Sequence, residues 1–225
     1  MSDETCWTMI RSAAKGEPGA RGDFCSRYLP VVRNYLAERW RGSSLASEVE
    51  DAIQEVFLEC LRLDGALDRF DERRASSFSA YLRAVVENVS RRVEERNALA
   101  RGRSSANEGL LDAAECREER LTLVFQRDLS ITLVRQARDR HRELAGTAGP
   151  EAERRFEILR LRFQEDLPLR EIATAWKADP AEIHREYARA REEFKKALRD
   201  VVRFHNPSHP ESVEQECQDL LGLLG

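Results

Sequence analysis

The sequence has few residues that break helices. It contains 11 glycines and 7 prolines among 225 residues, and aromatic residues make up only 7%. So few turn-forming residues do not suit a sandwich of short strands, which needs many tight turns. The charged fraction of 35% instead suits helices whose exposed faces carry mixed charge. We therefore predict an all-α fold.

Cysteine pairs are also missing. The five cysteines stand singly, with no CxxC pair and no histidine at metal-ligand spacing: Cys6, Cys25, Cys60, Cys116 and Cys217. This pattern indicates neither a zinc site nor a disulfide framework. We expect a protein of the reducing cytoplasm that holds no metal and no cofactor.

Long apolar runs and catalytic motifs are absent as well. No basic-then-apolar signal opens the chain, and no run of about 18 apolar residues occurs, so we expect neither secretion nor contact with a membrane. The sequence has no glycine-rich phosphate loop and no His pair at metal spacing, and its four histidines form no evident constellation with a nucleophile or a carboxylate. We therefore do not expect an enzyme.

The net charge of −4 is concentrated at one end of the chain. Residues 205–225 contain four acids and no Lys or Arg, which leaves 37 acidic and 37 basic residues in 1–204. A neutral body does not attract nucleic acid through its overall charge. Any binding to nucleic acid must therefore depend on local patches.

Residues 1–100 are predicted to form one helical domain. Ser47 and Glu50 have the spacing of a capping box, and the apolar pattern behind them predicts a helix over 48–63 that ends at Asp64-Gly65. Gly16 to Gly22 indicates a turn. A second amphipathic segment carries an apolar stripe at helical spacing: Tyr81, Leu82, Val85, Val86, Val89 and Val93.

The rest of the chain divides into a linker, a second domain and a tail. Residues 101–120 lose the helical periodicity and indicate a linker, which leaves room for a short helix. Helices at 121–145 and 151–164 are predicted to open the second domain, 121–204. The acidic tail, 205–225, has apolar residues at helical spacing: Val213, Cys217, Leu220, Leu221 and Leu224. It is either a short helix that packs on the last domain and masks its basic residues, or a frayed end.

Two closely spaced helices are predicted near the end of the second domain. The apolar pattern from Leu169 to Trp176 predicts a short helix, and Asp179-Pro180-Ala181-Glu182 has the composition of the next helix start. This is helix-turn-helix spacing. The second helix turns an apolar row inward (Ile183, Tyr187, Ala190, Phe194 and Leu198) and a polar row outward (His184, Arg185, Ala188, Arg189 and Glu192).

Three stretches resemble one family, the bacterial RNA polymerase sigma factors, and among them the two-domain extracytoplasmic-function type. EDAIQEVFLECL (50–61) resembles the polymerase-docking helix, and SFSAYLRAVVENVSRR (77–92) resembles the helix that engages and opens the minus-ten element. LPLREIATAWKADPAEIHREYARAREEFKKAL (167–198) is similar to the helix-turn-helix that reads the minus-thirty-five element. The resemblance implies core RNA polymerase and promoter DNA as partners, and leaves room for an anti-sigma factor or another regulator.

The resemblance also implies residue roles. The match to the polymerase-binding motif comprises Asp51, Gln54, Glu55, Phe57 and Leu58. The match to the minus-ten helix and the loop before it comprises Arg73, Arg74, Phe78, Tyr81, Asn88, Arg91 and Arg92, with the loop 68–77 expected to capture an unstacked base. The base-facing positions of the last helix are His184, Arg185, Ala188 and Arg189. For Phe57 and Tyr81 the alternative is a place in the hydrophobic core.

Local charge favours the DNA interpretation for one helix more than for the other. Residues 83–103 contain six arginines against three glutamates, whereas residues 179–200 contain six bases and six acids. The last helix departs from the family at Glu182, which we interpret as the partner in a capping box, and at Glu186, which has the spacing to pair with Arg189 or Arg185. We expect it to bind DNA weakly without polymerase.

Two alternatives stay open at this point. A helix-turn-helix regulator that works without polymerase would bind DNA alone, usually as a dimer, but it leaves the motif at 50–61 unexplained. A helical adaptor that uses the sigma scaffold only for protein contacts would suit the neutral last helix.

Overall fold

The computed structural model describes residues 6–70, 78–100, 111–205 and 213–222, with side chains from residue 9 onward except those of 111–116 and 204. Every regular element in these ranges is helical, so the all-α prediction is confirmed. The chain divides into two compact units. The first unit comprises Met1–Thr132 with Phe204–Ser208, and the second comprises Leu133–Arg203 with His209–Gly225.

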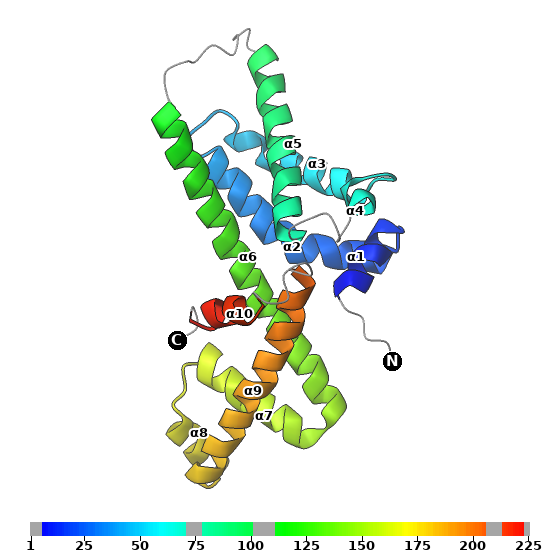
Figure 1. Ribbon diagram of the computed structural model, residues 1–225. Coiled ribbons are helices and arrows are strands. Elements are labelled where there is room, and N and C mark those ends of the chain that lie inside the picture. The colour runs from blue at the N-terminus through cyan, green and yellow to red at the C-terminus, as the bar shows by residue number, and fades with distance from the viewer. Residues whose placement is uncertain (1–5, 71–77, 101–110, 206–212, 223–225) are drawn as a thin grey trace. The chain divides into compact units, whose positions relative to one another are not determined.

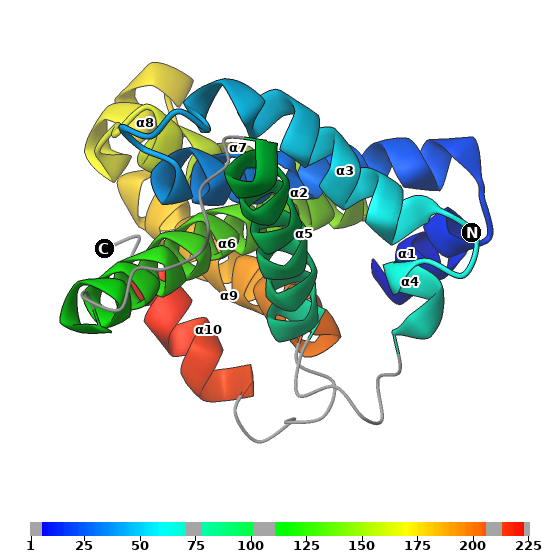
Figure 2. The same cartoon turned by 90° about the horizontal axis from the view of Figure 1, so that it is seen from above.

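The first unit is built from α1 (Cys6–Ala14), α2 (Pro18–Arg39), the short 3-10 helix η1 (Ala46–Glu48), α3 (Val49–Leu61), α4 (Ala66–Arg69), α5 (Phe78–Ala100) and the first part of α6 (Leu111–Ala148). Helix α3 packs against both α2 and α5, and α1 lies beside α4 (Figures 1 and 2). The turn expected over 16–22 is shorter than predicted. Only Gly16 has the positive φ of a turn, and α2 already begins at Pro18, since proline is well tolerated in a first helical turn.

Aromatic side chains form the centre of the first unit. The Phe24 ring lies 6.0 Å from that of Phe57, nearly edge-on, and 6.3 Å from that of Phe78. Tyr28 joins the same cluster, with its ring 5.0 Å from Phe24. Such edge-to-face pairs add about 0.5–1.5 kcal/mol each to what area burial alone contributes.

The end of α9 (Pro180–His205) contributes His205 to this aromatic cluster. The His205 ring is fully buried, 6.1 Å from both Tyr28 and Phe78. Its place in the first unit was not foreseen from the sequence, which groups residue 205 with the acidic tail.

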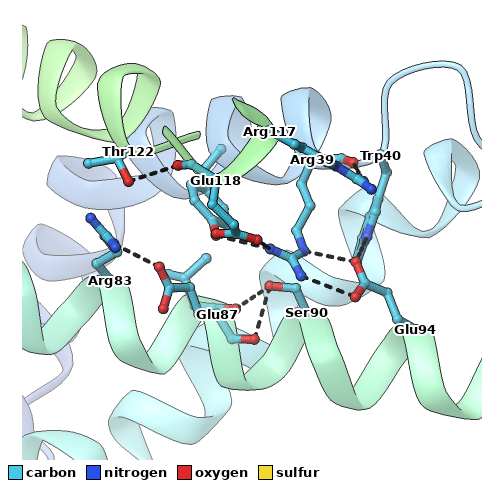
Figure 3. Close-up of polar contacts among 11 residues, drawn as sticks. Arg39, Trp40, Arg83, Glu87, Ser90, Glu94, Arg117, Glu118 and Thr122 are labelled. Carbon is cyan, nitrogen blue, oxygen red and sulfur yellow. Dashed lines mark hydrogen bonds and ion pairs between the residues drawn. The ribbon is translucent and has the colours of Figure 1, made fainter. Parts of the chain in front are cut away.

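A partly buried ion-pair network connects α2, α5 and α6 within the first unit (Figure 3). The Arg39 guanidinium donates two hydrogen bonds to Glu94, at 2.8 and 3.1 Å, and a third to Glu118 at 3.2 Å. Trp40 Nε1 donates to the same Glu94 carboxylate at 2.8 Å. Burial alone would raise the pKa of Glu94, but these bonds outweigh it and lower that pKa. Glu118 lies within the predicted linker, which is helical from Leu111 onward.

The start of α3 differs from the predicted capping box. Glu48, and not Ser47, precedes the helix, and no side chain caps it. The Ser47 hydroxyl donates to the Ser44 carbonyl at 3.4 Å, and Glu50 pairs with Arg33 of α2. The 3-10 turn of η1 makes a backbone bond of its own, Glu48 N–H to Leu45 C=O at 2.9 Å, so the chain enters α3 already coiled.

The second unit contains the rest of α6, α7 (Pro150–Gln164), α8 (Leu169–Trp176), α9 up to Arg203, and α10 (Val213–Gly222). Ile158, Ile172, Ala173 and Ile183 form a core shared by α7, α8 and α9. The break predicted over 146–150 is a single residue, Gly149, between the end of α6 and the start of α7. Its φ of 104° favours glycine. The tail forms the predicted amphipathic helix, α10, which buries Val213, Cys217 and Leu220 in the second unit.

Candidate functional site

Helix α3 presents one exposed face. Asp51, Gln54 and Leu58 are exposed, and Glu55 is half-buried beside them, because residues three, four and seven apart share a helix face. Leu58 leaves 67% of its surface accessible. Four of the five residues in the predicted polymerase-binding set therefore reach the surface.

Phe57, the fifth, lies in the core. Only 9% of its surface is accessible, and its ring packs edge-on against Phe24. The sequence left open a place in the hydrophobic core for this residue, and the structure confirms that alternative. The cause is helical spacing, since Phe57 follows Ile53 and Val56 on the side of α3 that faces α2. Phe57 can support the exposed face, but it does not form part of it.

The residues predicted to contact the minus-ten element also divide into buried and exposed members. Phe78 is fully buried among Phe24, Tyr28 and Phe70, so it belongs to the core and cannot meet DNA directly. Tyr81 is half-buried, its ring lies 5.0 Å from Phe70, and its hydroxyl donates to the Ala66 carbonyl at 2.7 Å. This hydrogen bond joins α5 to α4. Much of the Tyr81 side chain therefore belongs to the core, as the alternative interpretation of this residue expected.

The polar members of the set are exposed on α5. Asn88, Arg91 and Arg92 all reach the surface, and the Asn88 amide oxygen accepts a hydrogen bond from Arg91. Tyr81, Asn88 and Arg92 lie along one edge of the helix because they are seven and four residues apart. Arg73 and Arg74 fall outside the described residues.

Two glutamates of α3 meet the arginines of this edge. Glu59 lies 3.4 Å from Arg92, and Glu55 lies 2.5 Å from Arg96. The same Glu59 carboxylate accepts hydrogen bonds at 2.9 Å from Arg62, just after α3, and from Arg69 of α4. Burial would raise the pKa of Glu59, but Arg62 and Arg92 outweigh it and lower that pKa.

The sequence analysis did not single out Glu59, Arg62, Arg69 or Arg96. A signal for two of the contacts was present: Glu55 and Glu59 are four residues apart on one helix, and Arg92 and Arg96 are four apart on the next. Two antiparallel helices with this spacing place opposite charges face to face. The arginines of the turn and of α4 carry no such signal.

In the second unit, α8 and α9 are separated by a short turn, residues 177–179. Lys177 has φ 50° and ends α8, and the Asp179 carboxylate accepts a hydrogen bond from Ala181 N–H at 3.1 Å. Ile183, Ala190, Phe194 and Leu198 are buried and Tyr187 is half-buried, which is the inward row that the sequence predicts. The predicted base-facing residues are all exposed: His184, Arg185, Ala188 and Arg189.

The two acids of α9 that depart from the family pattern both face α7. Glu186 accepts a hydrogen bond from Arg154 at 2.9 Å, and Glu182 lies 3.7 Å from the same guanidinium. The expected pairing of Glu186 with Arg185 or Arg189 is therefore wrong, and Glu182 is an ion-pair partner instead of a capping-box partner. Arg154 also lies over the Trp176 ring, 5.3 Å from its centroid, so one arginine joins three helices. Neither acid neutralises the exposed row.

Helix α10 of the acidic tail contacts α9 away from that exposed row. Its Glu214 pairs with Arg199 at 3.1 Å, ten residues further along α9 than Arg189, and all four predicted base-facing side chains are exposed. Helix α10 thus pairs with one basic residue of the last domain, and masking of its basic residues stays a prediction.

Neither a metal-binding cluster nor a membrane-spanning helix occurs in the described part of the chain. Within it, no three His, Cys, Asp or Glu side chains are grouped so that they could hold a metal ion. Of the helices that the structure describes, none has the length and apolarity of a membrane span.

Comparison with known proteins gives one match. Residues 24–98, which include α3, α4 and most of α2 and α5, match the family model described as Sigma-70 region 2. No curated protein matches the chain. The match covers the elements that carry the exposed face of α3 and the arginine edge of α5. Residues 24–98, a third of the chain, are therefore similar to sigma-70 region 2.

Proposed function

We propose that the protein is a sigma factor of the extracytoplasmic-function type. Sigma-70 region 2 binds core RNA polymerase and melted promoter DNA. The observation that carries the proposal is the pair of surfaces inside the matched region: an exposed stripe on α3 and, beside it, an arginine-bearing edge on α5. A factor that works on these partners acts in the bacterial cytoplasm and catalyses no reaction itself.

The stripe of Asp51, Gln54, Glu55 and Leu58 is assigned to core polymerase. It combines an exposed leucine with carboxylate and amide groups. Phe57, the residue before Leu58, packs on Phe24 and so holds this part of α3 against the core. A central apolar side chain surrounded by polar groups is the usual composition of a protein interface. The edge of Asn88, Arg91 and Arg92 is assigned to the minus-ten element, with Tyr81 as its support.

The exposed row of α9 is assigned to the minus-thirty-five element. His184, Arg185, Ala188 and Arg189 occupy the first half of a long helix that follows a short helix and a tight turn, which is the position from which a recognition helix enters a major groove. The match to region 2 does not extend to this part of the chain. Support for the assignment comes from the exposure of these side chains and from the pairing of Glu182 and Glu186 away from them.

The test is co-elution of the purified protein with bacterial core RNA polymerase on size exclusion. The wild-type protein should co-elute, and Gln54→Ala/Leu58→Ala should not. The matched control is Leu123→Ala/Gln126→Ala, which removes an equally exposed leucine and a glutamine from α6 of the same unit. Circular dichroism checks that each variant is folded. A wild-type protein that fails to bind core polymerase would contradict the sigma assignment.

A further inference from the structure

The second unit contains a pocket formed by α6, α7 and α9. Its volume is about 480 Å³, within the range of about 300–1,000 Å³ that is usual for small-molecule sites. The three helices supply most of its apolar walls, and α10 adds one leucine: Val134, Phe156, Leu159, Phe163, Phe194 and Leu221. None of the surfaces assigned to polymerase or DNA includes a residue of this pocket.

The aromatic walls are fixed by contacts outside the pocket. The Phe156 and Phe194 rings lie 5.4 and 6.2 Å from the ring of His141, which is itself buried. The residues before the two phenylalanines, Arg155 and Glu193, form an ion pair at 2.8 Å that joins α7 to α9. Because these walls are already in place, little binding free energy is lost in ordering them around a ligand.

Positive charge accompanies the apolar walls. Of the described residues that line the pocket, none has a carboxylate and six are cationic: Arg135, Arg138, Arg160, Arg162, Arg191 and Lys195. Four of these six pair with acids that lie outside the lining. Arg135 and Arg191 are exposed and form no ion pair with any described residue, although the Arg191 guanidinium lies 5.9 Å from the centroid of the Tyr187 ring. Both can therefore donate to an anion that enters the pocket.

This lining selects one class of ligand. Gln164 and Tyr187 are the only uncharged polar side chains among the described lining residues, which is too few to satisfy the hydrogen-bonding groups of a sugar or a nucleobase. A cationic ligand would meet positive charge with no carboxylate to offset it. The apolar walls instead match a hydrocarbon chain, and a guanidinium group matches a carboxylate, to which it donates two parallel N–H bonds.

We propose that this pocket binds a medium-chain fatty acid, with the acyl chain against Phe156, Leu159 and Phe194 and the carboxylate held by Arg135 and Arg191. The ligand contacts α6, α7 and α9 together, so it stabilises the folded second unit as its concentration rises. The proposal does not depend on the sigma function, because it uses other residues.

The experiment is isothermal titration calorimetry of the full-length protein with sodium decanoate, below the concentration at which decanoate forms micelles. Acetate has the head group alone and 1-decanol has the chain alone, so these two compounds are the ligand controls. A single decanoate should bind per chain, with a dissociation constant about tenfold or more below that of either control, because both parts of the ligand have partners in the pocket. Decanoate should also raise the melting temperature.

Three variants locate the binding site. Arg135→Gln/Arg191→Gln should weaken decanoate binding by about tenfold and leave 1-decanol binding unchanged, because only the head group loses its partners. Arg127→Gln/Arg170→Gln is the matched control, since these exposed arginines of α6 and α8 also pair with no described acid and do not line the pocket. Val134→Phe adds a ring to the wall and should abolish decanoate binding. Circular dichroism checks that each variant is folded.

Several outcomes would overturn the proposal. One is a wild-type protein that shows neither binding heat nor a higher melting temperature with decanoate. Another is the binding of several decanoates per chain that Val134→Phe does not reduce, which would indicate detergent-like adsorption. Unchanged affinity in Arg135→Gln/Arg191→Gln would exclude the two arginines as partners of the carboxylate. Absence of decanoate binding, together with loss of polymerase co-elution by Val134→Phe, would assign the pocket to a protein contact instead.

Discussion

The hydroxyl of Tyr28 and Nε2 of His205 lie 3.4 Å apart, although 177 positions separate the two residues in the sequence. Both belong to the aromatic cluster of the first unit, and both side chains are fully buried. The last residue of α9 is thus a structural member of the domain that matches sigma-70 region 2, and not part of an independent tail.

This position predicts a pH dependence of stability. Burial, together with a smaller contribution from the Arg27 guanidinium, lowers the pKa of His205 to about 3. An unfolded histidine has a pKa of about 6.5, so below that pH the unfolded chain takes up a proton that the folded chain does not. The free energy of unfolding should therefore be fully maintained above about pH 6.5 and fall by about 1.4 kcal/mol per pH unit toward pH 3.

Chemical denaturation of wild-type protein and His205→Gln at several pH values checks this prediction. The variant should be less stable at neutral pH, and its stability should vary less between about pH 6.5 and pH 4. His141 of the second unit also has a lowered pKa, chiefly through burial, with Glu193 opposing the shift, and it accounts for part of the pH dependence that remains. Equal slopes in the two proteins would show that His205 is accessible to protons.

A second prediction concerns Gly65. Gly65→Ala should destabilise the first unit by about 1–3 kcal/mol, because the added methyl group meets backbone oxygens that cannot rotate away. Gly22→Ala is the matched control: this glycine lies inside α2, a Cβ there has nothing within 4 Å, and alanine favours the helix, so stability should rise slightly. Thermal melts of the two variants compare them, and similar melting temperatures would mean that the turn after α3 can open without cost.

A third prediction separates packing from binding on α3. Phe57→Ala should cost about 3–5 kcal/mol of stability, because it empties a site packed against Phe24. Leu58→Ala should leave the melting temperature nearly unchanged and weaken binding to core polymerase, since this side chain contacts mainly solvent in the free protein. A Phe57→Ala variant that is stable but fails to bind core polymerase would mean that Phe57 contacts polymerase directly.

Residues 57 and 58 also show what the sequence could and could not predict. Periodicity predicts both ends of α3 to within two residues and the apolar stripe of α5, because one apolar face per helix decides where the helix lies. The resemblance predicts that both residues bind polymerase. A shared motif does not say which side chains form the binding surface and which support it from the core. The place of Phe57 depends on its contact with Phe24 of α2, which lies more than thirty positions away in the sequence.

The same limit applies to Glu59 and Arg154. Glu59 meets arginines from three segments, and Arg154 joins α7, α8 and α9. These contacts depend on how helices pack, and a charge pattern in one helix does not encode them. The predicted linker left room for a short helix, and its second half belongs to the long helix α6, where Glu118 and Arg117 contact Arg39 of α2.

The last prediction tests the role of α9 in DNA recognition. Arg189→Ala should reduce transcription from the cognate promoter while binding to core polymerase is retained, because an exposed arginine that contacts guanine contributes about 1–3 kcal/mol of base discrimination. Arg199→Ala is the matched control on the same helix, since Arg199 pairs with Glu214 of α10 and lies outside the exposed row. In vitro transcription with reconstituted holoenzyme should show a loss of about fivefold or more for Arg189→Ala and little change for Arg199→Ala. Equal activity of the two variants would mean that Arg189 does not contact bases, and would favour a role of α9 in protein contacts. The comparison is informative because a recognition helix depends on the position of its charges and not on their sum.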